Sequence, residues 1–355
     1  MTAPGLEAVA DLLSAAVTAR VTPGAVVQTG SSAGPRWTIA AGHVTYAADA
    51  ALVTPATVYD LASLTKVLAT ATLAMRHAAA GTLPLDAVVA DRLPQFAGQP
   101  RITVADLLEH AAGLPAHRPF YRAVAGRAGY LARIAAEPPA YAPRTRHAYT
   151  DLGFMLLGLL LEDAGTAPLA TQFDHLVRDA IGEADIGFGT RDAWRGRVAP
   201  TAVSPWRARM LAGVVHDDNA AALGGVAGHA GLFGTAGAVG ALARWYLSLW
   251  LGRISASAGI PSAMAVRFAR RRAVPGSSRA LGWDTMLPTS SCGSKLSPRA
   301  IGHTGFTGTS LWLDPDRDLY VVCLTNRVHP ANGGEGFKEL RAAVHDAIGT
   351  EWPTE

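Results

Sequence analysis

The chain has 355 residues, of which 49% are hydrophobic and 17% are charged. This balance excludes a highly charged disordered chain and provides enough apolar side chains for one large domain or two modest ones. The net charge of +3 has no basic stripe with interleaved aromatic residues beside it, so we expect no nucleic-acid partner.

The two ends of the chain carry the strand signals. Apolar residues at helical spacing predict a first helix over residues 4–20, before Pro23-Gly24. Runs of β-forming residues predict a hairpin of two strands near the N-terminus and three more strands near the C-terminus, at 25–29, 36–41, 300–303, 310–313 and 319–325. A final helix is predicted over residues 335–348.

The middle of the chain is predominantly helical. Apolar periodicity and terminal glycines predict helices at 67–80, 104–110, 152–164 and 237–251. The fold class expected is therefore α+β: an antiparallel sheet flanked by the N- and C-terminal helices, with a mainly helical insertion. We expect residues 1–60 and 255–355 to form the sheet domain and residues 61–254 the helical domain, with the active site at their junction.

Targeting and cofactor signals are weak throughout. The N-terminus carries Glu7 and Asp11 without an early positive cluster, which does not resemble a secretory signal. The longest apolar run, 152–161, is too short to span a bilayer, so we expect a soluble, cytoplasmic protein. Cys292 and Cys323 give neither a disulfide framework nor a metal-site spacing, and Cys323 reads as a buried inert thiol. We expect no cofactor and no metal, and the sequence leaves the oligomeric state open.

Ser63 and Lys66 lie three residues apart at the start of the first central helix, so they share one helical face. A serine hydroxyl becomes a good nucleophile when a neighbouring base takes its proton, and a lysine can act as that base when its pKa is lowered. A capping serine beside a surface lysine would give the same spacing. Only three lysines occur in the chain against 28 arginines, so a lysine at this position is informative.

Two further segments, Tyr149-Thr150-Asp151 and His303-Thr304-Gly305, follow Ser63-Leu64-Thr65-Lys66 in the chain. With these three motifs the sequence resembles the serine β-lactamase and penicillin-binding-protein superfamily. The resemblance is to the branch that holds class C β-lactamases, D-alanyl-D-alanine carboxypeptidases and esterases. It covers about residues 20–348 and includes the glycine-rich stretch from Leu223 to Phe233 and Gly282-Trp283-Asp284.

The resemblance implies a role for each motif residue. Ser63 would be the nucleophile, with Lys66 and Tyr149 sharing general base and general acid duty. His303 would bind or orient the substrate at the edge of a strand, in the motif with Thr304 and Gly305. The backbone N–H groups of Ser63 and Phe306 would form the oxyanion hole.

Two positions depart from the family pattern. Asp151 stands where asparagine is usual, and a carboxylate there should hold Lys66 protonated, which shifts the base role toward Tyr149. His303 stands where lysine is usual. An unperturbed histidine titrates near neutrality, which predicts activity or anion binding that changes between about pH 5.5 and 7.5.

Several other features permit two interpretations. His216-Asp217-Asp218 could suggest metal ligands, but adjacent loop residues rarely converge on one ion, and a helix cap is the simpler interpretation. Gly224–Gly228 is more consistent with a tight turn near the mouth of the site than with a phosphate cradle. His229 is expected to be structural, although it could face the pocket. Trp283 could line the acyl pocket or belong to the core.

The sequence thus predicts a serine hydrolase that forms an acyl-enzyme through Ser63. The expected substrate is a small carboxylic ester or a D-amino-acid amide or peptide. A D-alanyl-D-alanine carboxypeptidase and a β-lactamase are the alternatives within this class, and a catalytically silent penicillin-binding-like protein is the alternative outside it. The presence of Ser63, Lys66 and Tyr149 together argues against the last of these.

Overall fold

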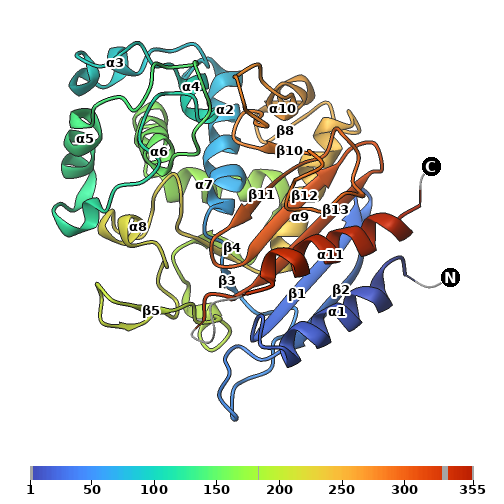
Figure 1. Cartoon of the computed structure of the whole chain (residues 1–355). Helices are drawn as coiled ribbons and strands as arrows, with labels where there is room; N and C mark the ends of the chain where they lie inside the picture. The colour runs from blue at the N-terminus through green and yellow to red at the C-terminus, as the bar shows by residue number, and fades with distance from the viewer. Residues whose placement is uncertain (1–2, 183, 330–334, 354–355) are drawn as a thin grey trace.

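A six-stranded antiparallel sheet, built from both ends of the chain, is the base on which the rest of the protein packs (Figure 1). The computed structural model describes residues 3–182, 184–329 and 335–353. The strand order is β10-β11-β12-β13-β1-β2. The bounds are Gly24–Ser31 for β1, Gly34–Gly42 for β2, Asp284–Thr285 for β10, Ile301–Gly305 for β11, Thr309–Asp314 for β12 and Leu319–Thr325 for β13.

Both faces of this sheet are buried, and alternate residues of each strand point to different helices. Helices α1 (Leu6–Thr18) and α11 (Phe337–Glu351) lie together across one face, over Val27, Val321 and Cys323 (Figure 1). Helix α9 (Ala236–Trp250) covers the other face and packs on β1 and β13. Strands β1, β12 and β13 are therefore buried along almost their whole length.

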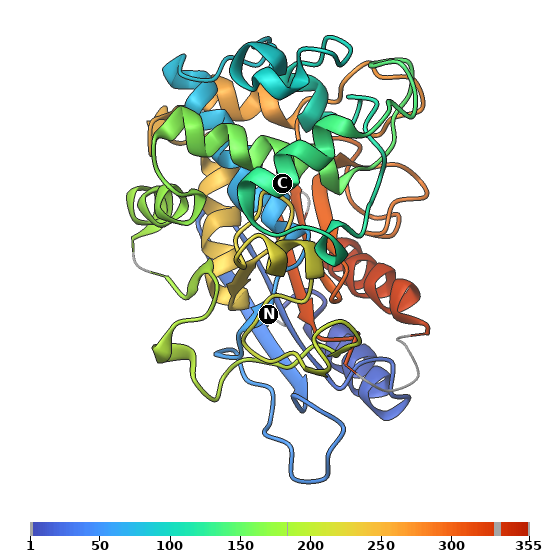
Figure 2. The same ribbon diagram turned by 90° about the vertical axis from the view of Figure 1, so that its left-hand side faces the viewer.

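The remaining helices form a cluster beside one edge of the sheet, as the view turned by 90° also shows (Figure 2). The segment Lys66–Ala71, which has π-helical hydrogen bonding, continues directly into α2 (Thr72–Ala80). Helix α6 (Asp151–Gly165) is buried on almost all sides, from Leu152 to Leu161. The other helices are α3 (Val89–Arg92), α4 (Val104–Leu108), α5 (Gly126–Ala136), α7 (Leu169–Ile181), α8 (Asp218–Ala222) and α10 (Ser262–Ala269).

Three small sheets complete the fold. β3 (Tyr59–Asp60) and β4 (Ile186–Phe188) both pair with β7 (Leu232–Gly234), which brings three distant parts of the chain together just before Ser63. The other two sheets are hairpins, formed by β5 (Val203–Ser204) with β6 (Arg209–Met210) and by β8 (Ala256–Ser257) with β9 (Ile260–Pro261).

The α+β class, the antiparallel sheet and the flanking terminal helices confirm the sequence prediction. Two helices differ in detail. The predicted helix 67–80 begins with a wider π-type segment, and the predicted helix 335–348 is observed at Phe337–Glu351. Both cysteines are buried. Within the described part of the chain, no single helix is long and apolar enough to cross a bilayer, and the pair α6 and α7, bent by 74°, passes only on length and composition.

Candidate active site

Ser63 lies in the turn between β3 and the first central helix. The preceding residue, Ala62, has a left-handed backbone with φ of 46°, although it carries a Cβ. Leu61 donates its N–H to the carbonyl of Leu232 in β7, and the turn closes with bonds from Leu64 and Thr65 back to residues 61 and 62. The strained turn therefore presents Ser63 at the mouth of the helix rather than within it.

Lys66 is completely buried and uses its ammonium group three times. Its Nζ donates to Ser63 Oγ at 2.9 Å, to Asp151 Oδ1 at 2.8 Å and to the carbonyl of His229 at 3.2 Å. Three acceptors match the three N–H donors of a protonated lysine. The structure thus brings Ser63 and Lys66 together and excludes the alternative of a surface lysine.

The charge on Lys66 is set by two opposing effects. Burial alone would lower the pKa of Lys66, but Asp151 and Tyr149 outweigh it, so the pKa lies above its usual value. Burial likewise acts to raise the pKa of Asp151, whereas Lys66 and His117 hold it well below the usual range. The pair is therefore an ammonium and a carboxylate at neutral pH, as the departure from asparagine predicted.

Tyr149 lies in the extended segment before α6 and stacks among ionisable groups. Two cations lie over the Tyr149 ring. The Lys66 Nζ is 4.9 Å from the ring centroid, and the Arg279 Cζ is 5.3 Å from it. The ring of His110 packs against it at 4.6 Å. His110 accepts the Thr150 N–H at its Nδ1, so its position fixes the backbone beside Tyr149. The Tyr149 phenol is thus surrounded by cationic and aromatic side chains.

The third motif lies on β11, at an edge of the main sheet. The short β10 pairs only with Ile301 and Gly302 of β11. Residues 303–305 therefore border the pocket, where His303 and Thr304 are lining residues. At Gly305 a Cβ would lie 2.7 Å from the carbonyl oxygen of Leu61, so only glycine permits the strand to pack against the turn that carries Ser63.

The expectation that His303 titrates near neutrality is wrong. Burial, Arg279 and Lys66 together lower the pKa of His303 well below 6.5. Its Nδ1 lies 2.8 Å from the carbonyl of Thr304, while its buried Nε2 has no partner within the described residues. His303 is therefore a neutral imidazole across the pH range of the predicted change.

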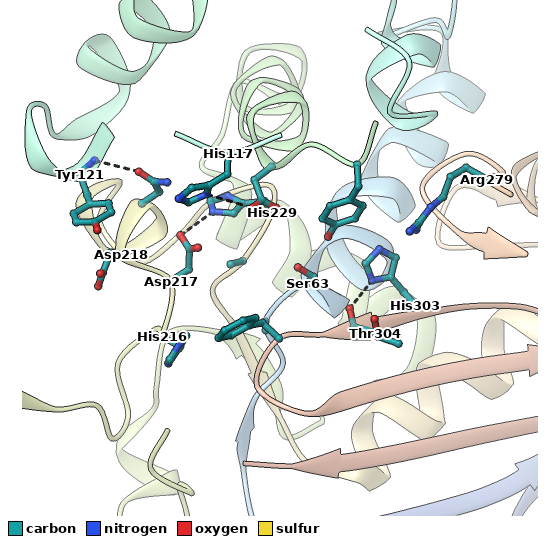
Figure 3. A pocket seen from close by; sticks show the side chains of 16 residues that line it. Ser63, His117, Tyr121, His216, Asp217, Asp218, His229, Arg279, His303 and Thr304 are labelled. Carbon is teal, nitrogen blue, oxygen red and sulfur yellow. Dashed lines mark hydrogen bonds and ion pairs between the residues drawn. The ribbon is translucent and has the colours of Figure 1, made fainter. Parts of the chain in front are cut away.

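These residues line one pocket of about 630 Å³. Ser63 lies between its two ends in the close view (Figure 3). Figure 3 shows Arg279, His303 and Thr304 on one side of the serine and His117, Tyr121, Asp217 and His229 on the other. The ring of Phe306 is 62% exposed and lines the same pocket. Each residue predicted for the site other than Lys66 and Gly305 is thus a lining residue, and those two lie directly behind the wall.

Several residues of the pocket were not predicted from sequence as functional. Arg279 and His117 line it, and His110 supports it, yet none belongs to a motif of regular spacing. Arg279 lies three residues before Gly282-Trp283-Asp284, which is the nearest signal that could have indicated it.

The ambiguous features are now placed. His229 Nε2 donates to Asp217 Oδ1 at 2.9 Å and also faces the pocket, while Asp217 caps α8. Trp283 is buried in the core against Tyr246. Gly224 and Gly225 form a turn with positive φ. Within the described ranges, no group of three or more histidine, cysteine, aspartate or glutamate side chains could hold a metal ion.

Comparison with known proteins identifies the family of the chain. The family model described as Beta-lactamase matches residues 9–345, and the chain belongs to that family. A protein of Escherichia coli K12, provisionally named a D-alanyl-D-alanine carboxypeptidase, is 32% identical over 317 residues, which cover 78% of this chain and 70% of that protein.

Solved structures share the fold. EstCE1, titled a hydrolase with promiscuous acyltransferase activity, has a TM-score of 0.76 at 22% identity, covering 97% of this chain and 98% of the other. A class C β-lactamase from Rhodobacter sphaeroides has a TM-score of 0.74 at 21% identity, covering 96% and 99%. The chain thus has the fold and family of the serine β-lactamase and penicillin-binding-protein hydrolases.

Proposed function

We propose that the protein is a serine hydrolase that forms an acyl-enzyme through Ser63. The observation that carries this proposal is the buried Lys66 ammonium, bonded at once to Ser63 Oγ and Asp151 at the mouth of a pocket. A buried lysine that ends on a serine hydroxyl has no evident structural purpose, because an apolar side chain would fill the same space without the desolvation cost.

In the proposed reaction, Tyr149 reacts as its phenolate: Ser63 Oγ attacks the substrate carbonyl carbon while the phenolate oxygen accepts the hydroxyl proton and becomes a neutral phenol. Lys66 is protonated and has no free lone pair, so it serves by stabilising a tyrosinate and the negative charge on the attacking oxygen. The tetrahedral oxyanion would be bound by the N–H groups of Ser63 and Phe306. Collapse breaks the bond to the leaving group, which takes the proton from Tyr149. Water then releases the acyl group by the reverse sequence.

The proposed substrates are acyl compounds whose leaving group carries a carboxylate, such as a peptide that ends in a D-amino acid. Arg279 supports this class, because its Nε and Nη1 are buried and have no partner within the described residues. The nearest carboxylate, on Asp284, lies 3.8 Å from its Nη2. Arg279 also lines the pocket, and a guanidinium binds a carboxylate with directional, charge-assisted hydrogen bonds. The relative from Escherichia coli is named for a substrate of this class.

The test compares an N-acyl D-alanyl-D-alanine peptide with its C-terminal amide and with a neutral nitrophenyl acetate. We expect the wild-type protein to cleave the acid about 10-fold or more faster than the amide, as kcat/KM. Arg279→Ala should remove that preference, with a loss of about 10- to 100-fold on the acid and little change on the ester, because only the acid contacts the guanidinium. Intact mass spectrometry would follow the acyl adduct, with Ser63→Ala as the unreactive control.

Each outcome separates the alternatives. Equal rates on acid and amide, with Arg279→Ala unchanged, would contradict the carboxylate assignment and leave a simple esterase. Rapid turnover of a penicillin would favour a β-lactamase, whereas a stable penicillin adduct would favour the peptidase. An absence of any adduct at Ser63, with ester, peptide and fluorophosphonate alike, would make the protein a binding module.

A further inference from the structure

Asp60 is a buried carboxylate immediately before the turn that carries Ser63. It ends β3 and is only 1% exposed. Its two oxygens accept from two different parts of the backbone: Oδ1 from the Ala62 N–H at 2.8 Å, and Oδ2 from the His216 N–H at 2.6 Å. No lysine, arginine or histidine of the described chain forms a salt bridge with it. A buried carboxylate used only for two backbone amides is costly, so its placement calls for an explanation.

The first oxygen of Asp60 acts on the strained residue before the nucleophile. A side-chain oxygen that accepts the N–H two residues on forms an Asx-turn, and here that N–H belongs to Ala62 in the left-handed region. An alanine in this region costs about 1 kcal/mol or more unless another contact enforces it. Because the peptide that follows Ala62 carries the Ser63 N–H, the direction of that amide depends on this turn.

The second carboxylate oxygen and the backbone carbonyl of Asp60 act on the segment that carries the other expected oxyanion donor, the Phe306 N–H. The backbone N–H of His216 donates to Asp60 Oδ2, and the His216 ring packs against the Phe306 ring with 5.5 Å between the centroids. The hydroxyl of Thr307 donates to the Asp60 carbonyl at 2.8 Å. Phe306 therefore lies between two groups that are anchored to the same aspartate.

Thr309 Oγ1 also donates to the Leu61 carbonyl, at 3.0 Å, so β12 is joined to the same turn. The amides of Ser63 and Phe306 themselves donate to no protein group among the described residues. They are thus free for a ligand, and a brace of four hydrogen bonds from residues 60 and 61 joins the segments that carry them.

We propose that Asp60 is a positioning residue that sets the spacing of the Ser63 and Phe306 amides, and thereby the geometry of the oxyanion hole. This inference rests on the proposed acyl-enzyme chemistry. Oxyanion donors must lie about 2.7–3.1 Å from the developing charge, and a misplacement of about 1 Å costs roughly 100-fold in rate. Asp60 touches neither substrate nor nucleophile and acts only through the backbone.

The ionisation of Asp60 should appear in the pH dependence of the acylation rate, which a purely structural role of Asp60 would leave unchanged. Burial raises the pKa of Asp60 to about 6, with Asp217 acting in the same direction and the two amides and Arg207 acting against it. Below about pH 6 the protonated carboxyl becomes a poorer acceptor for one of the two N–H groups. The acylation rate should then fall with a midpoint near pH 6.

The experiment measures acylation by nitrophenyl acetate in the wild type and in Asp60→Asn. The amide has nearly the same shape but only one acceptor oxygen, so one of the two N–H groups loses its partner. We expect kcat to fall about 10- to 100-fold with KM changed less than about twofold, and the limb near pH 6 to disappear.

Asp314→Asn is the matched control. Asp314 is also 1% exposed and accepts the Ser297 and Asp316 N–H groups, but it lies at the end of β12 remote from Ser63. Its replacement should leave kcat and the pH profile at wild-type values. A wild-type kcat and an unchanged acid limb in Asp60→Asn would overturn the proposal.

Thr307→Val provides a second test of the proposal if Asp60→Asn does not fold. It removes the bond to the Asp60 carbonyl while keeping the side-chain volume, and we expect kcat to fall about 3- to 10-fold, with Thr307→Ser restoring it. An unchanged kcat in Thr307→Val would overturn the brace. If the wild type itself forms no adduct, the proposed function fails, which is distinct from a reactive wild type that is indifferent to these variants.

Discussion

The histidines at the two ends of the pocket meet opposite neighbours. At one end, burial together with the charges of Arg279 and Lys66 holds the pKa of His303 and of the supporting His110 well below its usual value. At the other end, His229 Nε2 lies 2.9 Å from Asp217, and His117 Nδ1 lies 3.7 Å from Asp151, which raises the pKa of His117. Burial and nearby cations therefore favour the neutral imidazoles of His303 and His110, whereas the Asp151 carboxylate favours the charged form of His117.

The two ends of the pocket therefore differ in the sign of the charged groups beside their histidines. Arg279 at one end forms a long ion pair with Asp284, 3.8 Å from its Nη2, while Asp217 at the other end is paired with His229 at 2.9 Å. Ser63 lies between them, where Lys66 and Asp151 balance each other. The following variants disturb the centre first and then each end in turn.

Lys66→Met should have the largest effect. It removes the cation beside Ser63, and we expect acylation to fall by about 10²- to 10⁴-fold. It also leaves Asp151 buried without its partner, which should lower the free energy of unfolding by about 3–5 kcal/mol. Urea unfolding would measure this loss. The double variant Lys66→Met/Asp151→Asn should recover most of the stability and none of the activity; a single variant as stable as the wild type would contradict the balance at the centre.

Asp217→Asn tests the end with paired carboxylates. Burial acts to raise the pKa of Asp217, but His229 and the Ala220 N–H outweigh it and lower the pKa to about 2. A depressed folded pKa gives stability that is present above the unfolded value near 4 and is lost as pH falls toward 2. The variant should lack this loss, of about 2 kcal/mol, in unfolding curves at pH 4.5 and 2.5. Asparagine still caps α8, so an equal acid loss in both proteins would count against the pair.

His303→Gln tests the opposite end and should have the smallest effect over the accessible pH range. A folded pKa below that of the unfolded chain means that only the unfolded state takes up the proton just below pH 6.5, so stability falls as pH falls. The variant should therefore lose less thermal stability than the wild type between pH 7.5 and 5. His175→Gln, on the exposed side of α7, is the matched control and should keep the wild-type slope. Identical slopes in all three proteins would show that His303 is not buried as a neutral ring.

Much of the architecture could be predicted because it depends on local patterns. The period of apolar residues indicated α1, α6 and α9, and runs of β-forming residues at both chain ends indicated five strands of the main sheet. The segments missed, such as β3, β4 and β7, have two or three residues each. They exist because distant segments pair around the turn that carries Ser63, and so short a segment has no period of its own.

The candidate site divides in the same way. Spacing along the chain favoured Ser63 beside Lys66, although a surface lysine would give the same spacing, and the altered motif residue Asp151 predicted the protonated lysine. For His303 the predicted ionisation was wrong. Its pKa depends on burial and on Arg279, and no motif near His303 in the sequence indicates that Arg279 lies beside it. Asp60 could not be selected from its sequence position either, since its importance comes from amides two residues and 156 residues away.

The sequence by itself determined which groups stand one helical turn apart and which segments have an apolar face, since both follow from backbone geometry within a few residues. Only the tertiary structure decided which charges face each other across the pocket, and hence which side chains are ionised. The physical reason is that a pKa responds to burial and to partners in space, such as Asp151, which lies 85 residues beyond Lys66 in the chain and 2.8 Å from it in the fold.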